Sequence, residues 1–415
     1  MGTVLYLAHR IPYPPDKGDK IRSWHMLRAL AERHRVLLGA FVDDPDDWRH
    51  RARFEALCED VCLRPLPRAL AVARGAAALA RGLPVTVPWY RDGGMRRWVA
   101  DVARRERPDV AVAFSSAMMQ YADALPDGVP VVADYVDVDS EKWAAYGRRR
   151  RGPLGWLYRR EARTLLGWER RMAARAAAVV LVSEPEADLF AARVPEAAAR
   201  VHAVGNGVDL ERFRPDPELP NPYPPGARAI AFTGLMDYWA NVDAVSWFAE
   251  EVLPRVRAER PEAAFWIVGA RPTDAVRRLE SIPGVVVTGA VPDTRPYIAH
   301  AALCVAPMRV ARGVQNKVLE ALAMARPVVL TPEAAEGIAL PPGAEGWVAR
   351  GAEGFAAHVL ALLREPPGPR WAVACRRWME GRYAWARHQR AFVDLVDEAA
   401  SAAGGLAPAA VAEAV

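Results

Sequence analysis

The stretch LCVAPMRVARGVQNKVLEALAMARPVVLT, from Leu303 to Thr331, decides how the rest of the chain is interpreted. It predicts a short apolar strand from Leu303 to Val305, a loop, a helix from about Asn316 to Ala325, and a second strand from Val328 to Leu330. Pro327 ends the helix, because the residue before a proline is pushed out of the α region. This order indicates one strand–helix–strand unit of a parallel sheet.

The predicted helix has two chemically different faces. Lys317 and Glu320 share one face, and Val318 and Leu322 share the other, which can pack on a sheet. A helix N-terminus carries unpaired N–H groups and partial positive charge, so together with Gly313 and Lys317 it suits a phosphate. Glu320, one turn further, can accept hydrogen bonds from a ribose diol. The alternative is an ordinary helix with an exposed Lys–Glu pair.

Length and composition indicate a globular protein of two or three domains. The chain has 415 residues, of which 52% are hydrophobic and 25% charged. Its net charge of +5 comes from 55 basic and 50 acidic residues. We interpret this as a mild excess spread over a large surface, which argues against nucleic acid as a partner.

The cysteines and the apolar runs favour a reducing cytoplasm. None of the four cysteines forms a CxxC pair, and Cys304 lies in an apolar strand, where a reduced thiol is usual. No signal peptide is recognisable at the start, and no apolar run approaches the roughly 18 residues that span a bilayer. We expect a protein that is soluble or that lies on a membrane surface.

The first half begins like a nucleotide-type α/β domain. A strand from Val4 to Leu7, a loop, a helix and a strand from Val36 to Phe41 follow one another. The loop contains Gly18 but no GxGxxG motif. With Lys17 and Lys20 it can meet a diphosphate, and the alternative is a solvated turn.

Carboxylates follow a later strand of the same half. Strands at 110–114, 129–133 and 178–182 continue the parallel rhythm, and Asp134, Asp137 and Asp139 come at the end of the second of them. Ligands of α/β enzymes bind at this edge of the sheet. The triplet Asp137-Val-Asp139 resembles a metal-binding DxD motif, but Asp139 can equally cap the next helix.

Two basic segments contain interleaved apolar residues. The segment from Glu141 to Arg175 mixes arginine with leucine, tryptophan and tyrosine, and Arg68 to Arg81 does so in an Ala/Leu-rich form. Such a mixture can rest on an anionic membrane face. Because Gly152-Pro153 interrupts the longer segment, we consider solvated helices packed on the domain the more favoured alternative.

A proline-rich connector from Phe213 to Gly226 separates the halves. We predict an N-terminal domain over residues 1–198, a C-terminal domain over 199–384, a crossover helix over 385–400 and a disordered tail over 401–415. Strands of the second half end at Gly234, Gly269 and Gly289, which we expect to leave room for a flat ligand.

The second half resembles the donor domain of retaining GT-B glycosyltransferases of family 4. The resemblance rests on the motifs GNGVD at 205–209, FTG at 232–234, FWIVG at 265–269, VTGAVPD at 287–293 and RGVQNKVLEALAMARPVV at 312–329. The first half, with AHRIPYPPDKGDKIRSWHMLRAL at 8–30 and VVADYVDVDSEKW at 131–143, resembles a subgroup associated with exopolysaccharide and exosortase/PEP-CTERM systems.

The resemblance implies an α/β architecture of two facing Rossmann-like domains with parallel sheets, and a C-terminal helix that crosses back to the first. It implies transfer of a sugar from a nucleotide-diphosphate donor to an acceptor hydroxyl with retention, without metal or other cofactor. The implied acceptor is a glycan or lipid-linked glycan in exopolysaccharide or oligosaccharide assembly. The implied location is the cytoplasm, at the inner face of the membrane, with peripheral contact to anionic lipid.

The resemblance also assigns donor contacts. Glu320 matches the second glutamate of the family's E-x7-E motif, which meets the ribose, whereas the first glutamate is replaced by Arg312. Lys317 and the amides of Gln315 and Asn316 would face the diphosphate, next to Gly313.

Further donor contacts would come from Gly18 and Lys20, from Gly234, and from the backbone of Val291, which would meet the base. The cation pair usual after the glycine at position 234 is missing, so Lys317, Arg312 or Lys20 would neutralise the leaving group. Asp137 would lie near the reacting carbon, which completes a predicted catalytic set of Asp137, Lys317 and Arg312.

Two other functions stay open at this stage. One is a GT-B enzyme that epimerises a nucleotide sugar at C2, for which paired acid and base residues are not evident. The other is a non-catalytic module that binds a membrane through the surface from Arg148 to Arg171.

Overall fold

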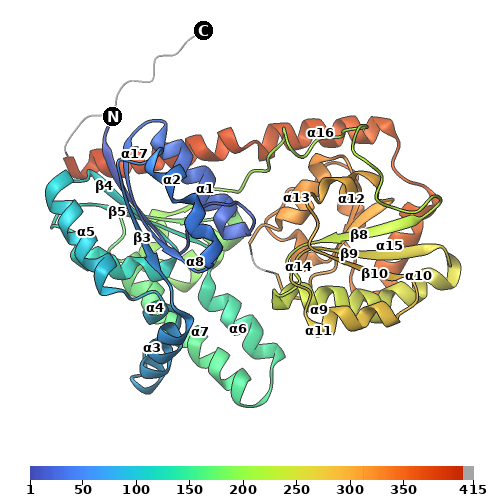
Figure 1. Cartoon of the computed structure of the whole chain (residues 1–415), viewed down its shortest axis with the longest axis horizontal. Coiled ribbons are helices and arrows are strands. Elements are labelled where there is room, and N and C mark those ends of the chain that lie inside the picture. The colour runs from blue at the N-terminus through green and yellow to red at the C-terminus, as the bar shows by residue number, and fades with distance from the viewer. Residues whose placement is uncertain (312, 405–415) are drawn as a thin grey trace, which may run out of the picture. The chain divides into compact units, whose positions relative to one another are not determined.

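The chain forms two units, each with a parallel β-sheet and flanking helices (Figure 1). The computed structural model describes residues 1–311 and 313–404. The first unit contains Met1–Gly205 and the chain from His388 onward, and the second contains Asn206–Arg387. The observed boundary follows Gly205 rather than residue 198, because Val201–Ala203 pairs in parallel with the strand before it in the first sheet.

Within the described residues the first sheet has seven strands in the order β3-β2-β1-β4-β5-β6-β7, all parallel. Their bounds are β1 Thr3–Ala8, β2 Arg35–Val42, β3 Asp60–Pro65, β4 Val110–Phe114, β5 Val131–Val136, β6 Ala178–Leu181 and β7 Val201–Ala203. β1 and β4 are buried along their whole length. Such continuous apolar strands are typical of a parallel sheet covered on both faces.

Helices connect these strands. They are α1 Gly18–Ala31, α2 Arg51–Glu55, α3 Arg68–Ala80, α4 Thr86–Trp89, α5 Gly93–Glu106, α6 Asp139–Arg149, α7 Gly152–Ala173 and α8 Glu184–Arg193, with 3-10 turns at Pro45–His50, Ser116–Ala124 and Pro195–Arg200. The last helix, α17 Trp385–Gly404, also contacts this unit, since Gln389 donates a hydrogen bond of 2.9 Å to the carbonyl of His25. Its helical end shows that residues 401–404 continue the helix instead of beginning a tail.

The second sheet has five parallel strands among the described residues, in the order β10-β9-β8-β11-β12. Their bounds are β8 Arg228–Thr233, β9 Ala263–Val268, β10 Val285–Gly289, β11 Leu303–Ala306 and β12 Val328–Leu330. The helices are α9 Trp239–Trp247, α10 Leu253–Glu259, α11 Asp274–Arg278, α12 Arg295–His300, α13 Asn316–Ala323, α14 Pro332–Ala335, α15 Gly351–Arg364 and α16 Pro369–Tyr383, with a π-helical turn at Phe248–Val252 and 3-10 turns at Leu279–Ser281 and Glu345–Trp347.

Helix α13 ends earlier than the sequence predicts. Its last residue is Ala323, and Ala325 adopts a left-handed conformation with φ 53°. The N–H of Arg326 bonds to the carbonyl of Ala321 at 2.9 Å, and the N–H of Ala325 bonds to that of Leu322. This is the Schellman pattern, which satisfies the last carbonyls of a helix. The helix therefore ends before Pro327 could interrupt it.

A buried ion pair joins α1 to β5 in the first unit. Arg22 and Asp134 have fully buried side chains, and Nε of Arg22 lies 2.9 Å from Oδ2 of Asp134. Nη1 of Arg22 also donates to the carbonyls of Val204 and Gly205, at 2.8 and 3.3 Å. The guanidinium thus fixes the end of β5 and the residues at which the chain leaves this unit.

Removing one partner of this pair should destabilise the first unit strongly. Arg22→Met leaves the Asp134 carboxylate buried without its cation, so we expect a loss of about 3–5 kcal/mol in the free energy of unfolding. Arg22→Met/Asp134→Leu should recover most of it. Denaturant unfolding followed by circular dichroism measures both.

The control is an exposed pair of the same unit, Arg33 with Asp394, at 3.2 Å and about half exposed on each side. Arg33→Met should change the free energy of unfolding by no more than about 1 kcal/mol. An equal effect of Arg33→Met and Arg22→Met would contradict the special role of the buried pair.

Candidate functional site

Strand ends of the second unit come together backbone to backbone. A Cβ on Gly269 would lie 1.7 Å from the carbonyl oxygen of Gly234, so only glycine fits where β9 ends beside β8. At Gly234 itself the space is taken by the amide of Asn241, which donates to the carbonyl of Leu235 at 2.9 Å. At 234 and 269 the space of a side chain is thus occupied by other parts of the protein, and the room for a flat ligand above these glycines stays a prediction. Gly289 alone of the three faces open space.

Helix α13 presents an uncapped N-terminus. Gln315 is its N-cap residue and makes no side-chain capping bond. The preceding loop turns at Gly313, whose φ is 63° and which is buried. Oδ1 of Asn316 is buried without a hydrogen-bond partner in the part of the chain that the structure describes. The helix therefore offers N–H groups to an anion, whereas Oδ1 of Asn316 is an acceptor and suits a donor such as a hydroxyl group.

Lys317 points along this helix toward apolar and amide groups. Its Nζ donates to Oδ1 of Asn241 at 2.9 Å and lies 4.8 Å from the centre of the Phe232 ring. It also approaches Sδ of Met308 at 3.9 Å. The ammonium is thus oriented by side chains of β8, α9 and the loop after β11.

Glu320 and Lys317 have opposite and converging pKa shifts. Burial lowers the pKa of Lys317 to about 8, against the attraction of Glu320. Burial also raises the pKa of Glu320 to about 7, although Lys317 and Arg212 act to lower it. Both groups are half-buried, so a ligand can reach them. They are charged together only in the narrow pH range between these two values.

Further cations lie at the same sheet edge, and sequence reasoning missed them. Arg271 follows β9 with φ 56° and pairs with Asp237 at 3.1 Å. Arg309, just after β11, holds Asp243 with two bonds of 3.0 and 2.5 Å. Their place directly after strand ends was a usable signal. They occupy the region where the expected cation pair after Gly234 is absent.

Val291 lies half-buried in the loop between β10 and α12. Its predicted contact with a base through the backbone stays a prediction. Arg312 lies outside the described residues, so its predicted role stays a prediction. Among the described residues no group of three or more His, Cys, Asp or Glu side chains is arranged to hold a metal ion.

In the first unit Asp137 follows a strained turn. Val136 at the end of β5 has φ 67°, and the N–H of Asp137 bonds to the carbonyl of Tyr135 at 2.8 Å. This i to i+2 bond around a positive φ is a rare form of γ-turn, and it is costlier for a β-branched residue. Ser115, at the end of the neighbouring strand β4, also has a positive φ of 83°. Strain at adjacent strand ends is typical of functional sites.

Asp137 lies near other carboxylates, Glu186 and Asp139. Burial and the charge of Glu186 raise its pKa to about 7, although Lys142 acts to lower it. Its Oδ1 is buried and has no hydrogen-bond partner among the described residues. Asp139 is in the first turn of α6, where the N-cap residue Val138 makes no side-chain bond. The capping alternative for Asp139 is therefore not what the structure has.

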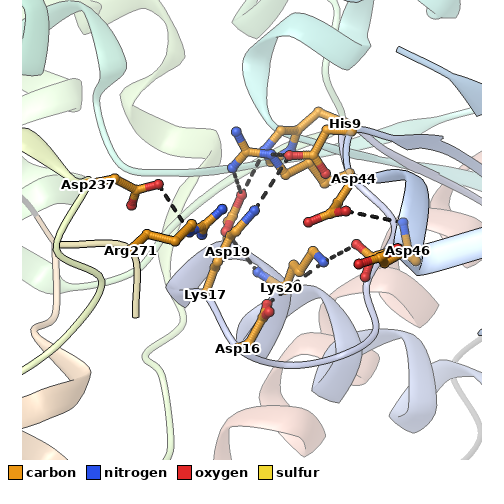
Figure 2. Close-up of polar contacts among 12 residues, drawn as sticks. His9, Asp16, Lys17, Asp19, Lys20, Asp44, Asp46, Asp237 and Arg271 are labelled. Carbon is orange, nitrogen blue, oxygen red and sulfur yellow. Dashed lines mark hydrogen bonds and ion pairs between the residues drawn. The ribbon is translucent and has the colours of Figure 1, made fainter. Parts of the chain in front are cut away.

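The loop before α1 is held by ion pairs. Lys20 is buried, with Nζ 2.6 Å from Oδ2 of Asp47 and 3.8 Å from Asp16 (Figure 2). A buried, paired ammonium is a structural group, so the structure favours Lys17 over Lys20 for any ligand contact. Lys17 is partly exposed, 3.6 Å from Asp43. Gly18 opens α1 and is exposed.

Asp19 is the centre of a second group of polar contacts in this unit (Figure 2). Its Oδ2 accepts from Nη1 of Arg10 at 2.7 Å and lies 3.1 Å from Nε2 of His9. Burial would raise the pKa of Asp19, but His9 and Arg10 outweigh it and hold this pKa well below its usual range. The His9 ring stacks on Phe114 at 5.7 Å. The first unit thus has a fixed carboxylate, Asp19, beside aromatic rings, and the sequence analysis did not predict this group.

Known structures share this fold. The chain is similar to Anabaena Alr3699/HepE in complex with UDP and glucose, with TM-score 0.63 and 13% identity over 96% of this chain and 100% of that one. It is similar to WaaG, a glycosyltransferase involved in lipopolysaccharide biosynthesis, with TM-score 0.62 and 16% identity over 95% and 99%. A glycosyltransferase from Rickettsia africae ESF-5 is similar with TM-score 0.61 and 11% identity, over 96% of this chain and 98% of that one.

Two family models match successive parts of the chain. Residues 21–212 match Glycosyltransferase Family 4, and residues 227–365 match Glycosyl transferases group 1. No curated protein gives a match. The protein therefore has the GT-B fold, and successive parts of it match two glycosyltransferase family models.

Proposed function

We propose that the protein is a retaining glycosyltransferase that moves a sugar from a nucleotide-diphosphate donor to an acceptor hydroxyl. The observation that carries the proposal is the N-terminus of α13, with its open N–H groups and the oriented ammonium of Lys317. Together these groups suit a diphosphate. Glu320, one turn further on, suits the ribose hydroxyls.

Breaking the bond between the sugar and the diphosphate sends its electron pair to the phosphate oxygen. Positive charge develops on the sugar, and negative charge on the leaving group. Fixed donors directed at that negative charge are usually the largest catalytic contribution. Lys317 and the α13 amides supply such donors, and Arg271 adds a further cation at the same sheet edge. These cations can balance the leaving group, so we propose transfer without a metal.

Asp137 is our candidate for the polar group near the reacting carbon. The strained turn at Val136 and the buried, unpartnered Oδ1 support a role beyond folding. In its ionised form the Asp137 carboxylate would stabilise the positive charge that develops on the sugar. We further propose that Gly313, Gln315 and Val291 contact the donor.

We propose an acceptor that is a glycan or a lipid-linked glycan, in exopolysaccharide or oligosaccharide assembly. The sequence motifs of the first half support the subgroup, and we place the protein in the cytoplasm at the inner face of the membrane. No helix of the described residues is long and apolar enough to cross a bilayer.

The decisive experiment joins a donor screen to product analysis. Nucleotide sugars are tested for protection of the purified protein against thermal unfolding, starting with UDP-glucose. The protecting donor is then incubated with acceptor extracts, and proton NMR reads the anomeric configuration of the product. We expect the configuration of the donor to be retained. An inverted product would reject the retaining mechanism, and absence of protection by every nucleotide sugar would reject the donor site.

Donor binding should depend on pH with a maximum between about 7 and 8. Below about 7 Glu320 becomes protonated and is a weaker acceptor for the ribose hydroxyls, and above about 8 Lys317 loses its charge. Affinity measured by calorimetry should therefore fall on both sides. Glu320→Gln should bind more weakly at pH 7.5 and lose the decline on the acid side. An unchanged profile in this variant would remove Glu320 from the site.

Lys317→Met should abolish most of the transfer while the fold is kept. Methionine retains the apolar contacts with Phe232 and Met308 but removes the positive charge, so kcat/KM should fall on the order of 10²–10³. Arg278→Gln, an exposed cation of α11 in the same unit, serves as the control and should behave as wild type. Retained turnover in Lys317→Met would end the assignment.

Asp137→Asn should lower kcat by about 10²-fold or more while donor affinity stays the same. In the wild-type enzyme kcat should decline below pH 7, because protonation removes the charge of Asp137. Asp188→Asn, at an exposed aspartate of α8 in the same unit, is the matched control and should keep this profile. If the two variants behave alike, Asp137 has no special role in the reaction.

A further inference from the structure

Exposed large apolar side chains gather on one part of the first unit. Those of α3, of the turn after it and of the start of α7 are Leu70, Val72, Leu83, Leu154 and Trp156, with Trp156 56% exposed. The other exposed large apolar residues of the described chain, Met1, Tyr238 and Val373, belong to other elements. Single exposed apolar residues need no explanation, but a cluster of them does.

Helix α3 has no polar outer face. Its inner side is formed by Ala71, Gly75 and Ala78, which are buried. The exposed positions are mostly apolar too: Ala69, Leu70, Val72, Ala73, Ala76, Ala77 and Ala80. A helix at a water-facing surface normally carries polar residues there. From Arg68 to Trp89 the sequence contains arginine but neither aspartate nor glutamate.

The charge of this region is strongly positive. Residues 68–89 and 147–168, which we call the basic apolar surface, contain ten arginines and one acid, Glu161. Their net charge of +9 exceeds the +5 of the whole chain, so the remaining residues sum to −4. The basic excess is thus concentrated here, and our interpretation of an evenly spread excess is wrong.

The two segments form one body. Glu161 of α7 is buried and accepts from the backbone N–H groups of Val85 and Thr86, at 2.7 and 2.8 Å. Arg160 next to it donates to the carbonyls of Leu79 and Leu83. The single acid of the surface is therefore used internally. α3, α6 and α7 extend away from the sheet of this unit (Figure 1).

We propose that the basic apolar surface docks this protein on an anionic phospholipid bilayer. Leucine, valine and tryptophan enter the boundary between headgroups and acyl chains, and arginines meet the phosphates, each worth about 1 kcal/mol near such a surface. A second copy of the chain fits poorly, because two +9 surfaces repel each other. Nucleic acid would meet the arginines, but the aliphatic face of α3 would gain nothing from its phosphates.

The test is co-sedimentation of the full chain with vesicles in the absence of donor. We expect binding to vesicles of phosphatidylglycerol mixed with phosphatidylcholine, and little binding to phosphatidylcholine alone. Salt should weaken it, since screening shortens electrostatic reach. Leu154→Ser/Trp156→Ser and Arg68→Gln/Arg81→Gln/Arg148→Gln/Arg151→Gln should each bind at least about tenfold more weakly.

The matched control uses exposed residues of α16 in the second unit, Arg370→Gln/Val373→Ser/Arg377→Gln, which should bind like wild type. The proposal would be overturned if both surface variants bound vesicles like wild type, or if the control lost as much binding as they did. It would also be overturned if binding did not depend on anionic lipid, or if the protein bound duplex DNA but not vesicles. Thermal protection by the nucleotide sugar is measured on the same variants and should stay unchanged. Docking and donor recognition can therefore fail separately.

Discussion

The first unit depends on a guanidinium that is fully buried, that of Arg22. Arg22 reaches from α1 to Asp134 in β5, where both side chains are fully buried, and to the carbonyls of Val204 and Gly205. An ion in such a place is tolerated only when every donor is used, so the geometry around it allows little variation. The same strand continues two residues later into the strained turn at Val136. A rigid support of this kind is what holds a β-branched residue at a positive φ and keeps Asp137 in its place.

The second unit uses desolvation differently. There the carboxylate and the ammonium of one helical turn are half-buried, and neither has a full set of internal partners. Burial brings their pKa values to about 7 and 8, so their charges are sensitive to whatever enters. A diphosphate would favour the ammonium form of Lys317. Burial thus disfavours the charged forms of both side chains, and a ligand of complementary charge would favour them again.

The distribution of charge links the proposed site and the proposed membrane contact. The basic apolar surface carries more positive charge than the whole chain. The strand ends of the second sheet, where we propose that the donor binds, have a few cations, and Arg271 and Arg309 among them are paired with aspartate. One surface is suited to a large, weakly specific anionic plane, and the other to a single diphosphate. An enzyme that takes a soluble donor and a lipid-linked acceptor would need both.

The order of elements, the parallel class and helix α13 with Lys317 and Glu320 on one face follow from the sequence alone. These features depend on periodicity and on breakers such as Pro327, which act over a few neighbouring residues. The fate of Lys20 could not be predicted, because its partner Asp47 comes 27 residues later. The contact of Gly269 with Gly234, the turn at Val136 and the aspartate partners of Arg271 and Arg309 could not be predicted either. Burial, strain and pairing are set by groups distant in the chain, so only the tertiary structure decided which charges are structural and which are left for a ligand.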